Sequence, residues 1–265
     1  MTELSLGSFV LTGLAAGGFA LAFGVALSAR LKSGLATLLA CAATACAAAG
    51  LAWHCALRHD ATPLRDNFDA LLWLAILVAL VSLYLRWRRT VGRIEWVAWP
   101  ITVVLLALAM IFGATQPHEY TRTTWSYTHL ISYVGCSIAF AVAASSGAMY
   151  LVLRQRLRSK HAPVDARLGS LEKLERATQT AVAIGFALLT AGIVTGLVRV
   201  LQKETSLGAQ WFWTPKVIFS VIAYVLYALV LHSPINPAFR GRRAAVLSIA
   251  GFVLLLGVII VQEMR

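Results

Sequence analysis

Long runs of apolar residues recur along nearly the whole chain, and short polar segments separate them. Most runs approach 20 residues, the length at which an α-helix crosses about 30 Å of hydrocarbon. The pattern predicts about eight transmembrane helices, at residues 7–28, 35–57, 67–85, 96–113, 127–153, 178–200, 215–232 and 244–261. The connecting segments are too short for a separate soluble domain. We therefore expect an all-α integral membrane protein, with a single polytopic membrane domain over residues 1–265.

The composition supports this fold class. Hydrophobic residues make up 59% of the 265 residues and charged residues only 13%, against about 25% charged in an average soluble domain. The net charge of +12 does not indicate nucleic-acid binding, because most of the basic residues follow the first, third, fifth and seventh predicted spans. This alternation matches the excess of lysine and arginine in cytoplasmic loops. It predicts that both termini lie outside.

The remaining polar segments carry few further signals. The first residues lack the basic region of a cleavable signal peptide, so we expect the first helix to be retained. Leu168, Leu171 and Leu174 recur at helical spacing among charged residues, which is typical of a short amphipathic helix over 163–176 on the cytoplasmic surface. The four cysteines lie in or beside apolar spans without a C-x-x-C pair. They are expected to be small buried hydrophobes.

The predicted outer loops are rich in aromatic residues and histidine. They cover residues 58–66, 114–126 and 202–214, and the last of these belongs to a tryptophan-rich loop at about 202–216. A tryptophan at the end of a span is often only an interfacial anchor. Three consecutive aromatic residues, Trp211 to Trp213, followed by Pro215 and Lys216, favour a flat apolar surface that suits a planar macrocycle.

Histidines are the candidate chemistry, because ionisable side chains inside a membrane are costly and are functional candidates by default. His129 opens the fifth span at the outer boundary, and neutral imidazoles are common ligands of haem iron. His54, His59 and His118 are all alternatives for a second ligand on that side. His232 ends the seventh span near the cytoplasmic interface, about 25 Å away at 1.5 Å of helical rise per residue.

Three segments near the end of the chain follow one another in a fixed order, GFALLTAGIVTG at 185–196, WFWTPK at 211–216 and LYALVLH at 226–232. Together they resemble the cytochrome c assembly family, which includes proteins of the CcsA and ResC type and, more distantly, CcmC and CcmF. PLRDNFDAL at 63–71 is similar to the family's entry to a helix, and WSYTH at 125–129 to its W-x-x-x-H pattern. The resemblance runs from about residue 58 to the end.

This resemblance implies that the protein handles haem in the biogenesis of c-type cytochromes. His129 and His232 would be the haem-iron ligands, and Trp211, Trp213, Pro215 and Lys216 the cofactor-binding surface. The haem would be of b type and bound without a covalent bond. We expect a haem transporter or chaperone, at most part of a cytochrome c synthase, rather than an enzyme with catalytic residues of its own.

The implied setting is a bacterial-type inner membrane, with the tryptophan-rich loop on its outer side. Expected partners are membrane lipid, a ResB-type membrane protein, thiol-reducing factors and apocytochrome c, and no nucleic acid. The chain departs from the family pattern at Thr214, where the family has Asp, at Val217 for Glu, and at Arg199 for an aromatic residue. The residues after the last span contain no second outer histidine, and Met264 is the remaining ligand candidate there.

These departures favour an alternative from another class. The chain would then be a non-haem accessory or structural subunit, similar to HemX-type assembly or regulatory factors, that keeps the fold within a larger membrane complex. An ion or proton carrier is disfavoured, because Asp69 and Glu95 both lie within a turn of span ends.

Overall fold

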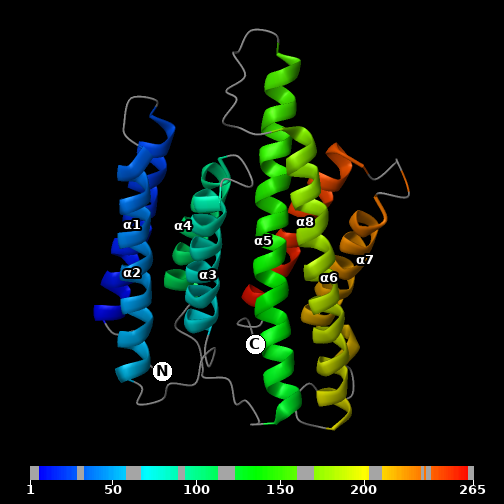
Figure 1. Ribbon diagram of the computed structural model, residues 1–265. Helices are drawn as coiled ribbons and strands as arrows, with labels where there is room; N and C mark the ends of the chain where they lie inside the picture. Colours follow the sequence, from blue (N-terminus) through cyan, green and yellow to red (C-terminus); the bar gives the residue numbers. More distant parts are fainter. Residues whose placement is uncertain are drawn as a thin grey trace. The chain divides into compact units, whose positions relative to one another are not determined.

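A computed structural model describes residues 6–28, 33–57, 67–88, 93–112, 123–159, 170–202, 211–233, 236 and 240–261. In these ranges the secondary structure is helical throughout, which confirms the predicted all-α class (Figure 1). The elements are α1 (Leu6–Leu27), α2 (Ser33–Leu57), α3 (Asn67–Arg88), α4 (Glu95–Phe112), α5 (Thr124–Arg158), α6 (Leu171–Leu201), the 3-10 helix η2 (Trp211–Trp213), α7 (Pro215–Leu231) and α8 (Arg242–Val261).

Five of these helices, α1, α2, α3, α5 and α6, are long and apolar enough to cross a membrane. Helices α4 and α7 are apolar but shorter, and α4 contains Pro100 near its beginning. A continuous helix satisfies its own backbone hydrogen bonds, which is the condition for spanning a bilayer. The eight α-helices of the described residues fall where the eight apolar runs predict them. The placement of both termini outside stays a prediction.

Helices α5 and α6 extend well beyond the predicted spans. Helix α5 has 35 residues and α6 has 31, because charged residues are costly only inside hydrocarbon and do not end a helix in water. The side chain of Ser170 caps α6 by accepting a hydrogen bond from the Lys173 N–H at 3.2 Å. The separate amphipathic helix expected over 163–176 is therefore wrong for its second half, which forms the first turns of α6. Leu168 lies outside the described residues, whereas Leu174 is fully buried.

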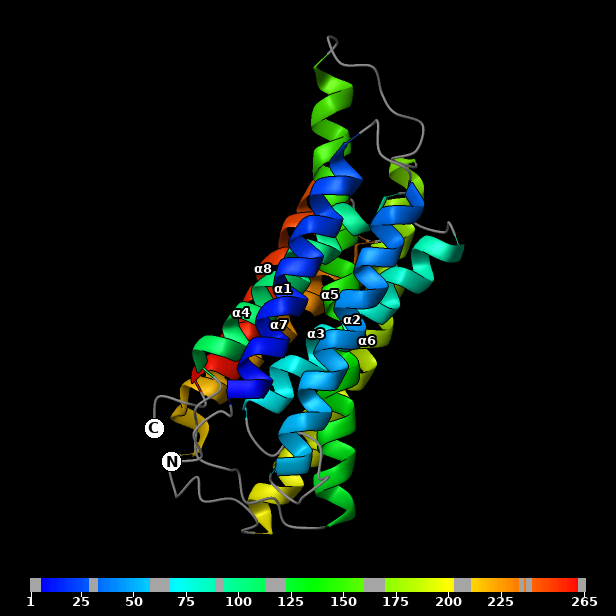
Figure 2. The ribbon, with the colours of Figure 1, turned by 90° about the vertical axis from the view of Figure 1, so that its left-hand side faces the viewer.

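The chain divides into two compact units, Met1–Glu119 and Tyr120–Arg265, here called unit 1 and unit 2. In unit 1, α1 packs against α2 and α4, and α3 packs against α4 and α2. In Figure 2, α1 and α2 lie side by side. Small residues allow this approach, since a Cβ atom at Gly18 would lie 2.9 Å from the Cβ of Ala43. The single membrane domain expected over 1–265 stays a prediction.

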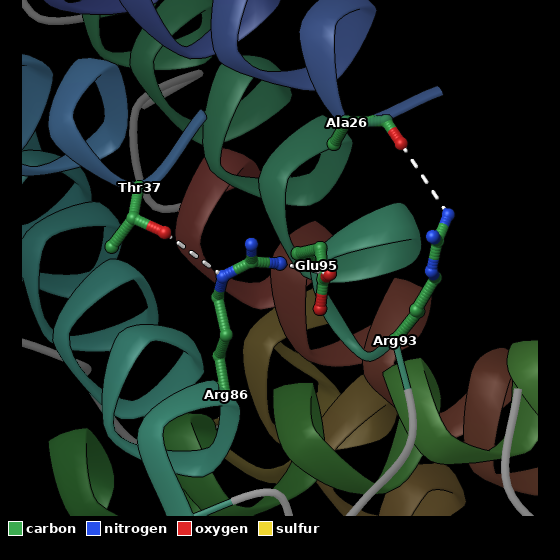
Figure 3. Close-up of polar contacts among 5 residues, drawn as sticks. All are labelled: Ala26, Thr37, Arg86, Arg93 and Glu95. Atoms are coloured by element: carbon green, nitrogen blue, oxygen red, sulfur yellow. Dashed lines mark hydrogen bonds and ion pairs between the residues drawn. The ribbon is translucent and has the colours of Figure 1, made fainter. Parts of the chain in front are cut away.

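A charged network joins the helix ends of unit 1 near residue 90 (Figure 3). Arg86, near the end of α3, forms an ion pair with Glu95 at the start of α4. Its Nε also donates to the Thr37 hydroxyl in α2 at 3.1 Å, and its guanidinium lies over the Trp99 ring. Arg93 donates to the Ala26 carbonyl at 3.5 Å. The contacts of Arg86 thus link α2, α3 and α4, and the contact of Arg93 ties the segment before α4 to α1, at the end that the basic residues predict to be cytoplasmic.

Unit 2 is built on the antiparallel pair α5 and α6, which lie side by side in Figure 1. Glycines of α6 set the register. A Cβ atom at Gly185 would lie 2.6 Å from Cε1 of Phe140, and one at Gly196 would lie 3.1 Å from Cε1 of His129. Each step toward the end of α6 therefore meets a residue nearer the start of α5. Close helix contact through small residues is the usual packing of membrane helices.

Helices α7 and α8 complete unit 2, and one buried aromatic side chain of α7 contacts both α5 and α8. Tyr227 of α7 stacks on Phe140 of α5, with ring centroids 3.5 Å apart and an interplanar angle of 7°. Its hydroxyl donates to the Ser248 carbonyl of α8 at 3.3 Å. A Cβ atom at Gly251 would lie 2.7 Å from its Cζ. Tyr227 thus fixes α5, α7 and α8 around one fully buried side chain.

Candidate functional site

His129 lies in the second turn of α5 and faces α6. Helix α5 begins after Thr123, whose hydroxyl accepts a hydrogen bond from the Ser126 N–H at 3.2 Å. This cap fixes the start of the helix. Ser126, His129 and Ser132 follow at intervals of three, so they share one face of α5. The imidazole is half-buried.

The His129 imidazole makes one short hydrogen bond, between its Nδ1 and the carbonyl oxygen of Gly192 at 2.8 Å. A carbonyl only accepts, so Nδ1 carries the proton and a neutral ring keeps its lone pair on Nε2. The Thr195 hydroxyl donates to the carbonyls of Ala191 at 2.8 Å and of Gly192 at 3.1 Å. None of the described residues hydrogen bonds to Nε2. Metal-ligating histidines share this feature, because their other ring N–H is commonly held by a carbonyl.

Gly196 provides the space for the ring. A Cβ atom there would lie 3.1 Å from Cε1 and 3.3 Å from Nδ1 of His129. Both distances are shorter than ordinary van der Waals contact. The side chain of His129 therefore occupies a seat formed by Gly192 and by Thr195 and Gly196, which follow it by three and four residues and so lie on the same side of α6.

The tryptophan-rich segment forms η2, one turn of 3-10 helix directly before α7. Trp213 is 68% exposed and Phe212 is 49% exposed, so two large apolar rings face outward. Phe212 packs edge-on against Trp211 and tilted against Trp213. Pro215 is the first residue of α7, where its missing N–H costs nothing. An exposed aromatic surface next to a helix start can receive a flat apolar ligand.

Thr214, at the family's Asp position, precedes α7 as its N-cap residue. Its hydroxyl donates to the Trp211 carbonyl at 2.7 Å, and it does not cap α7 through its side chain. Thr214 is buried. The position therefore closes the turn of η2 and offers no carboxylate.

Two cationic side chains lie within electrostatic range of His129, those of Lys216 and Arg199. The positive charge of Arg199 also acts on the ammonium group of Lys216. Lys216 is the second residue of α7, where the helix dipole disfavours a cation. Arg199 is only 8% exposed. The end of unit 2 that holds His129 therefore also holds two basic side chains that act on the imidazole.

His232 lies at the opposite end of unit 2 and is not brought together with His129. It caps the end of α7, is exposed, and its Nδ1 donates to the Ala228 carbonyl at 2.7 Å. The neighbouring Ser233 hydroxyl accepts from the Gln179 amide at 3.4 Å. Gln179 precedes Thr195 by sixteen residues along α6, about 24 Å at 1.5 Å per residue. The two histidines are too far apart for one macrocycle.

The other histidine candidates fall elsewhere. His54 belongs to unit 1, where its Nε2 lies 3.9 Å from Oδ1 of the buried Asp69 and its ring packs on Phe68. His59, His118 and Met264 lie outside the described residues. Sequence reasoning did not single out Gly192, Thr195, Gly196 and Ser126. The first three were visible only as part of the motif at 185–196.

These features define a class, the polytopic helical membrane protein in which a histidine of α5 packs on glycines of α6 and an exposed aromatic turn precedes α7. The family model described as "Cytochrome C assembly protein" matches residues 64–262. The chain belongs to this family. It is therefore a multi-pass membrane protein of cytochrome c assembly, a process that handles haem.

Curated relatives agree with the family assignment. The chain is 26% identical to the cytochrome c biogenesis protein CcsA of Parasynechococcus marenigrum, an alignment that covers 96% of this chain and 90% of the relative. It is 22% identical to CcsA of Guillardia theta over 72% of this chain and 70% of the relative. A shorter match, to CcsA of Trichormus variabilis, reaches 36% identity over 33% of the chain and 24% of the relative. No solved structure matches the chain.

Proposed function

We propose that the protein holds haem at the outer membrane face and presents it for attachment to c-type cytochromes. In this proposal Nε2 of His129 would coordinate the iron. Trp211, Trp213 and Pro215 form the apolar surface beside it, and Lys216 lies at its edge. The haem is of b type, held by coordination and apolar contact without a covalent bond.

The hydrogen bond between His129 and Gly192 is the observation that supports this function most directly. A helix-packing histidine needs only a partner for one nitrogen, and either tautomer would serve. Here the backbone carbonyl selects the tautomer with Nδ1 protonated, which directs the lone pair to the nitrogen farther from the helix backbone. Family membership, which ties the chain to cytochrome c assembly, makes haem iron the appropriate metal.

The residues of this site would bind and orient, and they would not react. Haem supplies the vinyl groups, and the substrate's own Cys-x-x-Cys-His segment supplies the thiols that form the thioether bonds. His129 would fix one face of the macrocycle, and the aromatic turn would shield an edge from water. Only four cysteines occur in the chain, and none of the described residues suggests a nucleophile for this step.

The proposed setting follows from the charge pattern and the family. The membrane is of the bacterial inner-membrane type, and the tryptophan-rich turn lies on its outer side. The partners we propose are lipid, a ResB-type membrane protein, thiol-reducing factors and apocytochrome c. His232 would contact haem only at the cytoplasmic end of unit 2, in a binding event separate from the one at His129.

A second candidate function is that of an accessory subunit without haem. Thr214 favours it, because its hydroxyl closes the η2 turn where the resemblance places a carboxylate. In that case the histidine seat would serve helix packing only. The chain would then copurify in fixed ratio with a larger membrane complex.

An absorption spectrum of the purified protein tests the proposal. Protein from haem-replete cells is expected to show a Soret band that weakens strongly in His129→Ala. His232→Ala is compared with it, because it removes a histidine from the other end of the same unit, and its band is expected to keep most of the wild-type intensity, since His129 holds the haem of the outer site. A colourless wild-type preparation that stays colourless after haem is added would refute the proposal and favour the accessory subunit.

A further inference from the structure

Three helix ends build the end of unit 2 that the charge pattern predicts to be cytoplasmic. Helix α5 ends there, and α6 and α8 begin there (Figure 1). Helix α5 packs against both of the others. A Cβ atom at Gly241, directly before α8, would lie 2.8 Å from the Tyr150 hydroxyl of α5. Arg240 forms an ion pair with Glu175 of α6 at 3.1 Å. The entry to α8 is therefore held against both α5 and α6.

Positive charge is in excess at this end of unit 2. Residues 150–159, 170–179 and 240–243 hold eight basic residues but only two acidic ones, Glu172 and Glu175. Both carboxylates are already paired, Glu172 with Arg176 and Glu175 with Arg240. The remaining basic side chains therefore outnumber the acidic groups of these three ranges that could neutralise them.

Two arginines of α5 lie at the depth of lipid headgroups. The predicted span of α5 ends at residue 153, and the helix continues to Arg158, about 8 Å further at 1.5 Å per residue. The polar layer on each face of a bilayer is about 5–8 Å deep, so Arg154 and Arg158 both fall within it. They are four residues apart and share one face of the helix. The last turn of α5 projects past the start of α6 in Figures 1 and 2.

An exposed leucine shares this face of α5. Leu157 is 48% exposed and follows Arg154 by three residues, so its side chain lies beside those of both arginines. A guanidinium group binds a phosphate through two parallel hydrogen bonds, whereas an exposed leucine gains only from an apolar partner. Basic and apolar side chains side by side at a membrane surface are typical of contact with anionic lipid.

We propose that the last turns of α5 bind an anionic phospholipid through Arg154, Leu157 and Arg158, here called the lipid site. The two guanidinium groups bind the phosphate, and Leu157 contacts the first carbons of the acyl chains. The excess of positive charge on α6 and α8 strengthens the attraction. The bound lipid would hold this end of unit 2 at the membrane surface. The inference does not depend on the proposed function in haem handling.

Native mass spectrometry of the full 265-residue protein tests the lipid site. Protein in a neutral detergent is titrated with phosphatidylglycerol or with phosphatidylcholine of the same acyl chains, and binding of the first lipid is followed. Wild-type protein is expected to bind phosphatidylglycerol at least tenfold more tightly. Arg154→Gln and Arg158→Gln should each lower this affinity by about fivefold, the contribution of one basic residue near an anionic surface. Their affinity for phosphatidylcholine should change much less.

Two further variants separate a site from a general effect of charge. Arg176→Gln is the matched control, because it removes one positive charge from the same end of unit 2, but from the exposed pair with Glu172 on α6. It is expected to keep the affinity for phosphatidylglycerol within about twofold, as exposed pairs contribute little. Leu157→Asn should weaken the binding of both lipids by a few-fold, because it removes the apolar contact that they share.

The outcomes decide both the site and its ligand. Equal wild-type affinities for the two lipids would overturn the lipid site and favour an acidic protein as the partner of this basic surface. An equal loss in Arg176→Gln and Arg154→Gln would also overturn it, because the preference would then come from the overall charge. Glycerol 3-phosphate carries the phosphate without acyl chains. If it displaces phosphatidylglycerol at equal concentration, the ligand is a soluble phosphate, and the assignment to lipid is wrong.

Discussion

Gly196 lies against the imidazole of His129, so closely that a Cβ atom there would come within 3.1 Å of Cε1. The glycine therefore determines where the proposed ligand stands. Its partner one turn earlier, Gly192, supplies the carbonyl that holds Nδ1. Small residues on α6 thus do two things at once, since they bring the helices together and they set the orientation of one side chain.

Substitution at Gly196 is expected to disturb ligation without removing the ligand. Gly196→Ala requires the ring to move by a few tenths of an ångström, and we expect a few-fold loss of haem affinity. Gly196→Val adds two methyl groups and should cost at least tenfold, because a shift of about 1 Å at a ligand is enough to spoil coordination. Titration of the Soret band measures both. A Gly196→Val protein with wild-type affinity would contradict the seat.

Gly17 in α1 offers the matched control. A Cβ atom there would meet nothing within 4 Å, so Gly17→Ala should leave haem affinity unchanged. Its thermal stability should rise slightly, because alanine is favoured over glycine in a helix by about 1 kcal/mol.

Tyr227 is the side chain on which the packing of unit 2 depends most. Gly251→Ala would place a methyl group 2.7 Å from its Cζ, and the ring cannot retreat because Phe140 stacks on its other side. We expect a loss of about 1–3 kcal/mol, typical of overpacking, measured as a lower melting temperature in detergent.

Gly257 on the same helix is the control for Gly251. The nearest atom to a Cβ there, Cδ2 of Phe219, would lie 3.6 Å away, which is ordinary contact. Gly257→Ala should therefore keep the wild-type melting temperature within a degree or two. Equal effects of the two substitutions would show that the stacked pair is not the constraint.

Removing only one partner of the ion pair between Arg86 and Glu95 should lower the stability of the protein more than removing both. Glu95 is buried, so Arg86→Gln would leave its carboxylate without its cationic partner and cost about 3–5 kcal/mol. Arg86→Gln combined with Glu95→Gln should recover most of this loss. Thermal unfolding of the single and double variants gives the coupling energy.

The pair between Arg176 and Glu172 is the reference for this cycle. Both side chains are about three quarters exposed, and such pairs are worth about 0.3–0.5 kcal/mol in a helix. A coupling energy for Arg86 and Glu95 that is no larger than this reference would mean that the buried network does not hold unit 1 together.

The order and type of the helices could be predicted from the sequence, because apolar length alone decides which segments can cross a membrane. Helix ends could not, as α5 and α6 show. Their charged terminal turns, around Arg156 and Glu172, are helical although hydropathy does not detect them. Ser170 was the available signal, since a serine followed by an acidic first turn is typical of a helix start.

The candidate site could be predicted only in part. His129 was identified by its depth, and the tryptophan turn by its composition. The seat of Gly192, Thr195 and Gly196 depends on the register between two helices, and a sequence does not show which residues face each other across an interface. The separation of His129 from His232 was predictable, because the direction of each span places them at opposite ends.

The topology itself gives the last prediction, because the proposed function requires the aromatic turn outside. Single cysteines are introduced in a cysteine-free background at Trp213, which is 68% exposed, and at Glu172, which is exposed in the first turn of α6. In intact spheroplasts a membrane-impermeant maleimide should label Trp213→Cys at once and Glu172→Cys only after permeabilisation. The excess of basic residues around Glu172 predicts this difference. If both positions label before permeabilisation, α6 does not cross the membrane, and the histidine seat on it loses the outer position that haem presentation requires.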